Sequence, residues 1–211
     1  SSSELKLQLE QVIASGKNNM MELKTILDHH FAPGSIDVNI MTKIDKDNFI
    51  DDEQLPVIYN DAHAALRGFV NSTTNSSVIF SAGMNPRLYG YMESFNEFYP
   101  DTNGQFQKRI VLKVSDFRSA MIQGNFLAKK GLWVSEYRIE SGLNCGGHAF
   151  ATDGFLLGPI LEEFKNKKDE LIQSAYSLFT NALASKNKIV PNEPPILKIT
   201  VQGGVGTVEE H

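Results

Sequence analysis

The segment Val78-Ile79-Phe80-Ser81-Ala82-Gly83-Met84-Asn85-Pro86 contains the change from strand to helix on which the predicted fold rests. Its first four residues form a short apolar run, which is typical of a buried strand, and Ala82-Gly83 ends that run. Asn85 followed by Pro86 predicts the start of a helix, because proline at the first helical position loses no hydrogen bond. The segment therefore predicts a strand that leads directly into a helix.

The same order recurs along most of the chain. Further strands are predicted at 36–41, 109–114, 132–139 and 196–201, and helices at 116–130, from Asp61 onward and from Phe155 to about Ala184. A charged loop is expected between Lys43 and Glu53. Asp116 is expected to cap its helix, and Gly131 to end it. Regular alternation of strand and helix favours an α/β fold of parallel βα units joined by right-handed crossovers, in the manner of a TIM barrel.

The first 32 residues differ from the rest. Apolar residues between Glu4 and His30 follow a helical period that is interrupted at Ser15-Gly16, so two short helices are predicted there. We expect one domain over 1–211, with these helices in 1–32 and the βα units in 33–211.

Bulk properties exclude several classes of protein. The 211 residues carry 20 basic and 25 acidic side chains, a formal net charge of -5, and no basic run that could follow a nucleic-acid backbone. No apolar run approaches the roughly 18 residues of a membrane span, and the polar start is unlike a signal peptide. The single cysteine, Cys145, cannot form an internal disulfide. We expect a cytoplasmic protein without nucleic-acid or membrane partners.

Unusual residues gather where predicted strands end, and parallel strands bring their carboxyl ends to one edge of a sheet or barrel. We therefore expect the chemistry of the chain at one rim. The residues concerned are Asn39, Ser81 to Asn85, Lys113 to Asp116, Gly142 to His148 and Gly203 to Thr207.

Two glycine pairs stand out within that set. Gly146-Gly147 lets a flat ligand approach the backbone closely, and His148 directly after it is a group whose pKa can be tuned near neutrality. Gly203-Gly204 follows an apolar strand, so its backbone N–H groups could hold a phosphate. Each pair also fits an ordinary turn, and His148 also fits a hydrogen-bonded structural histidine.

Taken in order, these motifs resemble the FMN-dependent nitronate monooxygenase family, which includes the flavin-dependent enoyl-acyl-carrier-protein reductases. The resemblance extends over roughly Ile36 to Thr207. It is carried by Val38-Asn39-Ile40-Met41, the strand and helix start at Val78 to Pro86, Gly146-Gly147-His148, Pro159 and Gly203-Gly204-Val205.

The resemblance implies an FMN cofactor and a small-molecule substrate. It places Asn39 against the flavin, Gly146 and Gly147 beneath the isoalloxazine, and Gly203 and Gly204 at the FMN phosphate. His148 would be the catalytic group, since a neutral imidazole can accept a proton from an acidic carbon while the flavin supplies the redox steps.

Three inferences rest on the residues alone. Lys113 ends an apolar strand and could stabilise negative charge on a reduced flavin, although a side chain that reaches solvent is slightly preferred. Glu136, Arg138 and Glu140 share one strand face and either line the site or form ion pairs. Cys145 is expected to pack rather than react.

The chain also departs from the family pattern. Phe150 stands where the family has a glycine, and the following residues 151–154 differ, so the substrate chemistry is open. Fewer strands are visible than the eight of a closed barrel. We therefore expect an incomplete (β/α)8 barrel that is a segment of a longer protein, whose partners are further domains of the polypeptide or a homo-oligomer.

Two other functions remain open from the sequence. One is a non-catalytic, barrel-derived module that binds a phosphate ligand or docks another domain. The other is a lyase or isomerase that acts on a sugar phosphate without flavin.

Overall fold

The structure is a computed structural model that describes residues 4–15, 20–30, 34–81, 83–140 and 157–202. The chain divides into two compact units, Ser1–Ser35 and Ile36–His211. The first unit contains α1 (Glu4–Ala14) and α2 (Met20–His30), which confirms the two short helices predicted there.

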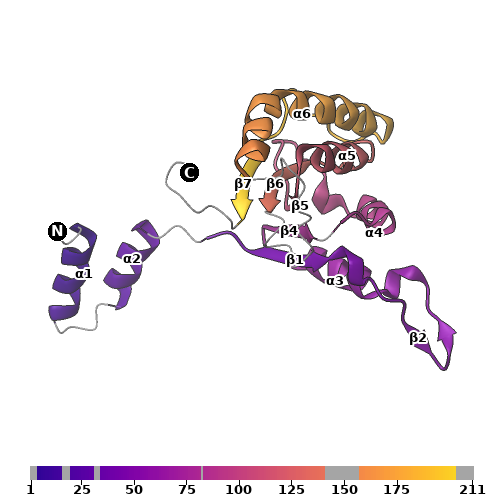
Figure 1. Cartoon of the computed structure of the whole chain (residues 1–211). Coiled ribbons are helices and arrows are strands. Elements are labelled where there is room, and N and C mark those ends of the chain that lie inside the picture. Colours follow the sequence, from indigo (N-terminus) through magenta and orange to yellow (C-terminus); the bar gives the residue numbers. More distant parts are fainter. Residues whose placement is uncertain (1–3, 16–19, 31–33, 82, 141–156, 203–211) are drawn as a thin grey trace. The chain divides into compact units, whose positions relative to one another are not determined.

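The second unit is built on a five-stranded sheet in which every neighbouring pair is parallel. Its strands are β1 (Asp37–Met41), β4 (Ser76–Ser81), β5 (Lys108–Val114), β6 (Val134–Glu140) and β7 (Lys198–Gln202). They lie side by side in chain order, β1-β4-β5-β6-β7 (Figure 1). The α/β class and the parallel βα units are therefore confirmed, and each predicted strand of this unit is present within a few residues of its expected bounds.

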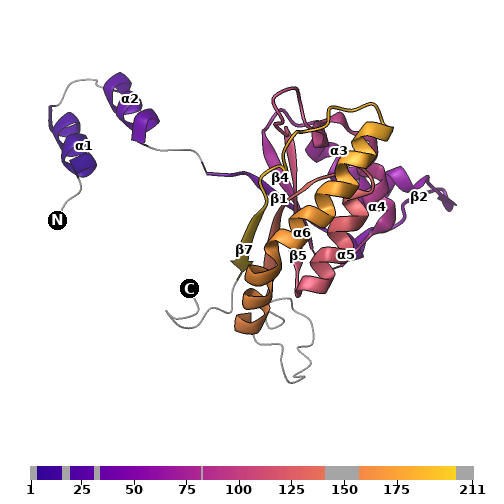
Figure 2. The same cartoon turned by 90° about the horizontal axis from the view of Figure 1, so that it is seen from above.

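Helices α3 (Asp61–Val70), α4 (Pro86–Tyr91), α5 (Phe117–Ala128) and α6 (Leu157–Ser185) connect successive strands and cover one face of the sheet (Figures 1 and 2). Short 3-10 turns add to the connections: η1 (Thr42–Ile44), η2 (Val57–Tyr59), η3 (Met92–Ser94) and η4 (Asn96–Phe98). Strand residues such as Phe80, Leu112 and Ile139 pack into the core against helix residues such as Leu66 and Phe179. We call the opposite face of the sheet, on which none of α3 to α6 packs, the open face.

Local signals in the sequence explain how the helices begin and end. Asn85 caps α4 by accepting a hydrogen bond from Leu88 N at 3.1 Å, and Asp116 caps α5 by accepting one from Ser119 N at 2.7 Å. Gly131, just after α5, has a φ of 73°, a conformation that strongly favours glycine. These capping predictions are confirmed.

The prediction of a charged loop at 43–53 is wrong in detail. It contains η1 and a two-stranded hairpin of β2 (Phe49–Ile50) and β3 (Glu53–Gln54). Asp51 and Asp52 form the turn with φ values of 46° and 65°, and positive φ at both central residues matches the twist of a tight hairpin. The sequence signal for this hairpin is weak because both turn residues are aspartates and no glycine is present.

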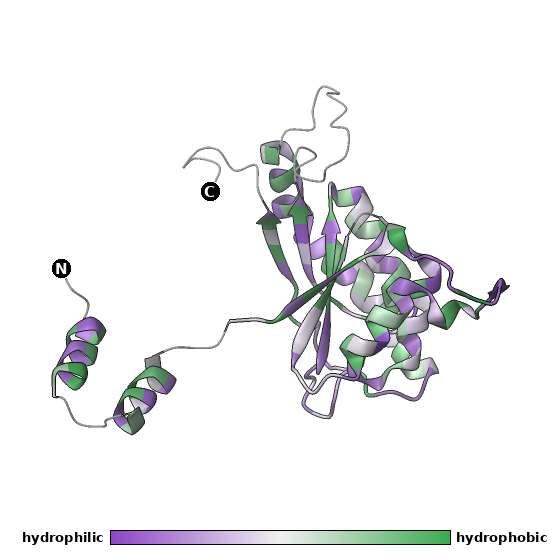
Figure 3. Cartoon of the chain, turned by 90° about the horizontal axis from the view of Figure 1, so that it is seen from below, coloured by the Kyte–Doolittle hydropathy of each residue, from purple (hydrophilic) through white to green (hydrophobic). Residues whose placement is uncertain are grey.

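Hydropathy largely alternates along the edge strands β1 and β7, as expected for strands with two different faces, whereas the central strands β4 and β5 contain the apolar runs 78–80 and 110–112. Viewed from below, the strands show hydrophilic and hydrophobic residues in succession (Figure 3). No helix in the described part of the chain is long and apolar enough to cross a membrane.

Substitution of Gly124 tests the packing of α5 on the sheet. A Cβ added there would lie 1.8 Å from the Tyr137 hydroxyl, whereas nothing lies within 4 Å of one added at Gly68. We expect Gly124→Ala to lower the free energy of unfolding by about 2 kcal/mol through overpacking. Gly68→Ala, the control in helix α3, should raise it by about 0.5–1 kcal/mol. Urea denaturation measures both, and equal effects at the two positions would contradict the packing described.

Candidate functional site

The register of the sheet separates a polar open face from the apolar face under the helices. Residues that pair across parallel strands lie on the same face, so the open face can be followed from strand to strand. It carries Asp37, Asn39 and Met41 from β1, Ser77, Ile79 and Ser81 from β4, Arg109, Val111 and Lys113 from β5, Glu136, Arg138 and Glu140 from β6, and Lys198, Thr200 and Gln202 from β7. Each of the five strands thus contributes charged or hydroxyl groups to this face, while Ile79 and Val111 at its centre are apolar and only 6% and 1% exposed.

An arginine connects the first and fourth strands across this face. Arg138 Nε donates to Glu136 Oε1 at 2.8 Å, and its NH2 group donates to Asp37 Oδ2 at 3.3 Å. Thr200 Oγ1 adds a hydrogen bond to Glu136 Oε1 at 2.6 Å. Burial alone would lower the pKa of Arg138, but the hydrogen bonds to Glu136 and Asp37 raise it above its usual value. We call these four residues the β1–β6 bridge.

The bridge requires a curved sheet. Strands β1 and β6 are separated by β4 and β5, so a flat sheet would hold them about 14 Å apart. Facing side chains that meet over this span indicate that the open face is concave. Ligand sites are concave and mostly apolar, with a few placed polar groups, and Ile79 and Val111 supply apolar side chains among the polar ones of this face.

A second group of polar side chains lies toward the carboxyl ends of the strands. Ser81 Oγ donates to Asn39 Oδ1 at 2.9 Å, and Lys113 Nζ lies 2.8 Å from Glu140 Oε1. We call Asn39, Ser81, Lys113 and Glu140 the polar row. The side chains of Lys113 and Glu140 are only 11% and 9% exposed, so the preferred prediction that Lys113 reaches solvent is wrong. The carboxylate of Glu140 keeps the lysine within the sheet instead.

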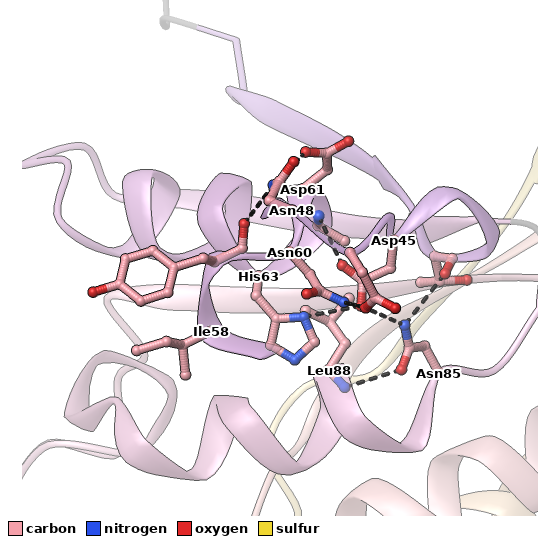
Figure 4. A network of polar contacts seen from close by, with 12 residues as sticks. Asp45, Asn48, Ile58, Asn60, Asp61, His63, Asn85 and Leu88 are labelled. Atoms are coloured by element: carbon pink, nitrogen blue, oxygen red, sulfur yellow. Dashed lines mark hydrogen bonds and ion pairs between the residues drawn. The ribbon is translucent and has the colours of Figure 1, made fainter. Parts of the chain in front are cut away.

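A buried polar network shapes the segment that follows β1 (Figure 4). Asp45 Oδ1 accepts a hydrogen bond from Ala62 N at 3.0 Å, so this carboxylate caps α3 from outside the helix. Its Oδ2 atom accepts from Asn85 Nδ2 at 3.2 Å and lies 2.9 Å from His63 Nδ1, at an angle that does not form a hydrogen bond. The N-cap position itself is Asn60, whose side chain makes no capping bond.

Other contacts extend this network on both sides. Thr42 Oγ1 lies 2.9 Å from the carbonyl oxygen of Ser81 and 2.7 Å from that of Gly83. The His63 ring is 1% exposed and contacts the Tyr91 ring, with 5.2 Å between the ring centroids. The network therefore joins the loop after β1 to the starts of α3 and α4. Its carboxylate already occupies the helix N-terminus, so its role is to hold the fold rather than to bind a ligand.

The structure brings together only some of the residues predicted for the site. Asn39 and Lys113 lie on the same concave face, and Glu136, Arg138 and Glu140 share it as predicted, in ion pairs. His148, Gly146, Gly147, Gly203 and Gly204 lie outside the described residues, as do Cys145 and Asp153. Their convergence with Asn39 and Lys113 stays a prediction.

Sequence reasoning missed several pairings, among them that of Asp37 with Arg138. Glu140 was recognised as a member of a strand face, but the ion pair that it forms with Lys113 needs the register of β5 against β6. Asp45 and His63 are separated by a hairpin, and no local pattern connects them. The only signal in the sequence is position, because Asp45 and His63 each lie close to the end or start of a predicted element.

Comparison of the chain with protein-family models, with curated proteins and with solved structures finds no match. Within the described residues, no three His, Cys, Asp or Glu side chains are grouped as a metal site would require. The chemistry of the site therefore has to be inferred from the polar row and the β1–β6 bridge.

Replacing Arg138 tests the curvature of the sheet. Arg138→Met leaves Asp37 and Glu136 without their shared cation, and we expect a loss of about 2 kcal/mol in the free energy of unfolding. Lys165→Met is the control, because Lys165 lies 4.0 Å from Glu162 on an exposed helix surface and should change nothing measurable. Equal stability of the two variants in chemical denaturation would argue against a bridge that holds the sheet.

Replacing Asp45 tests the network after β1. Asp45→Ala removes the cap of α3 and the partner of Asn85, which should cost about 2 kcal/mol and loosen the segment between Thr42 and Asp61. Limited proteolysis should then cut within this segment first. Asp169→Ala, on the exposed surface of α6, is the control, and unchanged cleavage in Asp45→Ala would refute the assignment.

Proposed function

We propose that this chain forms part of a (β/α)8-barrel, FMN-dependent oxidoreductase of the nitronate monooxygenase type, with the ligand on the open face. The observation that carries the proposal is the concave polar face of a parallel sheet whose strands follow one another in chain order. In barrels of this type the chemistry lies at the carboxyl ends of the strands, where the polar row is found.

Strand order and helix placement favour a barrel over a doubly wound sheet. A doubly wound sheet reverses its strand order at a switch point and carries helices on both faces. Here the order runs from β1 to β7 without reversal, and helices α3 to α6 cover one face. Curvature toward the open face also favours a barrel, because the strands of a closing barrel surround their inward-facing residues.

The donor groups of the polar row suit the ring of a flavin. Asn39 uses its Oδ1 atom for Ser81, and no hydrogen bond from its Nδ2 atom is found among the described residues. Lys113 has three N–H donors, and it forms an ion pair with Glu140, with Nζ 2.8 Å from Oε1. These groups can donate to the oxygen and nitrogen acceptors of the ring.

The bound flavin would supply the redox chemistry that side chains lack. In this proposal His148 holds or accepts the substrate proton, Gly146 and Gly147 leave room for the ring, and Gly203 and Gly204 offer backbone N–H groups to the phosphate. The support for these roles is the resemblance of the motifs, together with the positions of 141–148 directly after β6 and of 203–204 directly after β7 in the chain.

A second candidate is a non-catalytic module that binds a phosphate ligand or docks another domain. The ion pair between Lys113 and Glu140 favours it, because the carboxylate offsets a cation that a flavin enzyme could use. The two candidates differ in whether His148 is needed.

Flavin uptake is the direct test. The full chain, mixed with FMN and freed of unbound ligand, should keep a visible flavin spectrum. Gly204→Val should weaken FMN binding by about tenfold or more, since a side chain would block the backbone donors. Gly158→Ala, at an open helix position, is the control and should bind normally.

The role of His148 is tested on the same protein. His148→Ala should retain FMN and lose turnover of a small nitroalkane. Retained turnover would favour the binding module, and a wild-type chain that stays colourless with excess FMN would overturn the oxidoreductase.

A further inference from the structure

The Lys113–Glu140 pair is an unusual feature of the polar row, because two opposite charges are held together with little exposure. Lys113 lies near the end of β5, and Glu140 is the last residue of β6. Nζ and Oε1 are 2.8 Å apart, and both side chains are about nine-tenths buried. Such a pair adds little net stability, since removing both charges from water offsets most of their attraction.

The place of the pair suggests a different role. Both side chains point to the open face, next to the Asn39–Ser81 hydrogen bond and at the strand ends that lead to 141–148. Neither residue is shared with the β1–β6 bridge, which holds the curvature on its own contacts. Changes to the pair therefore leave the contacts of the bridge in place, and a ligand would reach the ammonium group through the 11% of the Lys113 side chain that is exposed.

We propose that Glu140 is a positioning residue that fixes the Lys113 ammonium group against the acceptor edge of the flavin ring and sets how much positive charge that edge experiences. The proposal rests on the proposed function. With Glu140 ionised, the pair is neutral as a whole and donates a hydrogen bond to an uncharged carbonyl edge. It thereby favours the oxidised ring over a ring that carries negative charge, because a lone cation would stabilise the latter more strongly.

Charge changes on the two partners have opposite consequences. Glu140→Gln keeps the size and shape of the side chain and removes the negative charge, so the site becomes cationic. Lys113→Met removes the positive charge and leaves the carboxylate, so the site becomes anionic. The double variant Lys113→Met/Glu140→Gln restores a neutral site and also shows whether the fold tolerates the loss of the pair.

The midpoint potential of the bound flavin is the measurement, made by dye-linked reduction of the full chain loaded with FMN. Glu140→Gln should shift the potential to more positive values and Lys113→Met to more negative values, with the double variant close to the wild type. Lys113→Arg, which keeps the charge, should stay near the wild type as well. A purely structural pair would alter the melting temperature without opposite shifts in potential.

Affinity gives an independent readout. Fluorescence titration should show FMN binding weakened about tenfold or more in Lys113→Met, the loss expected for a hydrogen bond from a charged donor. A flavin that binds to all variants with unchanged potential would overturn the inference and leave the proposed function standing. A wild-type chain that binds no flavin would overturn both.

Discussion

The guanidinium group of Arg138 makes the contact that shows most directly how the sheet of the second unit bends. It connects β6 to β1 over two intervening strands by binding Glu136 and Asp37. Helices α3 to α6 bury one face of the sheet in the core. On the other face, Arg138 and Asp37 reach each other only because the strands curve toward one another.

The curvature of this face affects how exposed its charged side chains are. In a flat sheet Lys113 and Glu140 would face solvent, whereas here they are held at about one-tenth exposure beside Asn39 and Ser81. The strand ends where these side chains lie are also where a barrel enzyme places its ligand. The contacts of Asp45 stabilise the same end of the sheet, because they attach the loop after β1 to α3 and α4.

Local signals in the sequence predicted the fold well because each acts over a few residues. Asn85 and Pro86 begin α4, Asp116 begins α5, and apolar runs such as 109–114 form central strands. The β2–β3 hairpin was missed because its turn lacks the glycine that marks most tight turns. The candidate site was predicted less completely. Lys113 and Arg138 each have a partner on another strand, and no local sequence pattern tells which residues of two strands lie side by side. His148 and the glycine pairs were singled out by motif alone and lie outside the described residues.

The most direct test of the central claim is a crystal structure of the chain with FMN bound. The proposal predicts electron density for the flavin ring on the open face, in contact with Asn39 and Lys113, with His148 and the Gly203-Gly204 backbone at the same cavity mouth. Density on another surface, or His148 and Gly203 at opposite ends of the sheet, would contradict it.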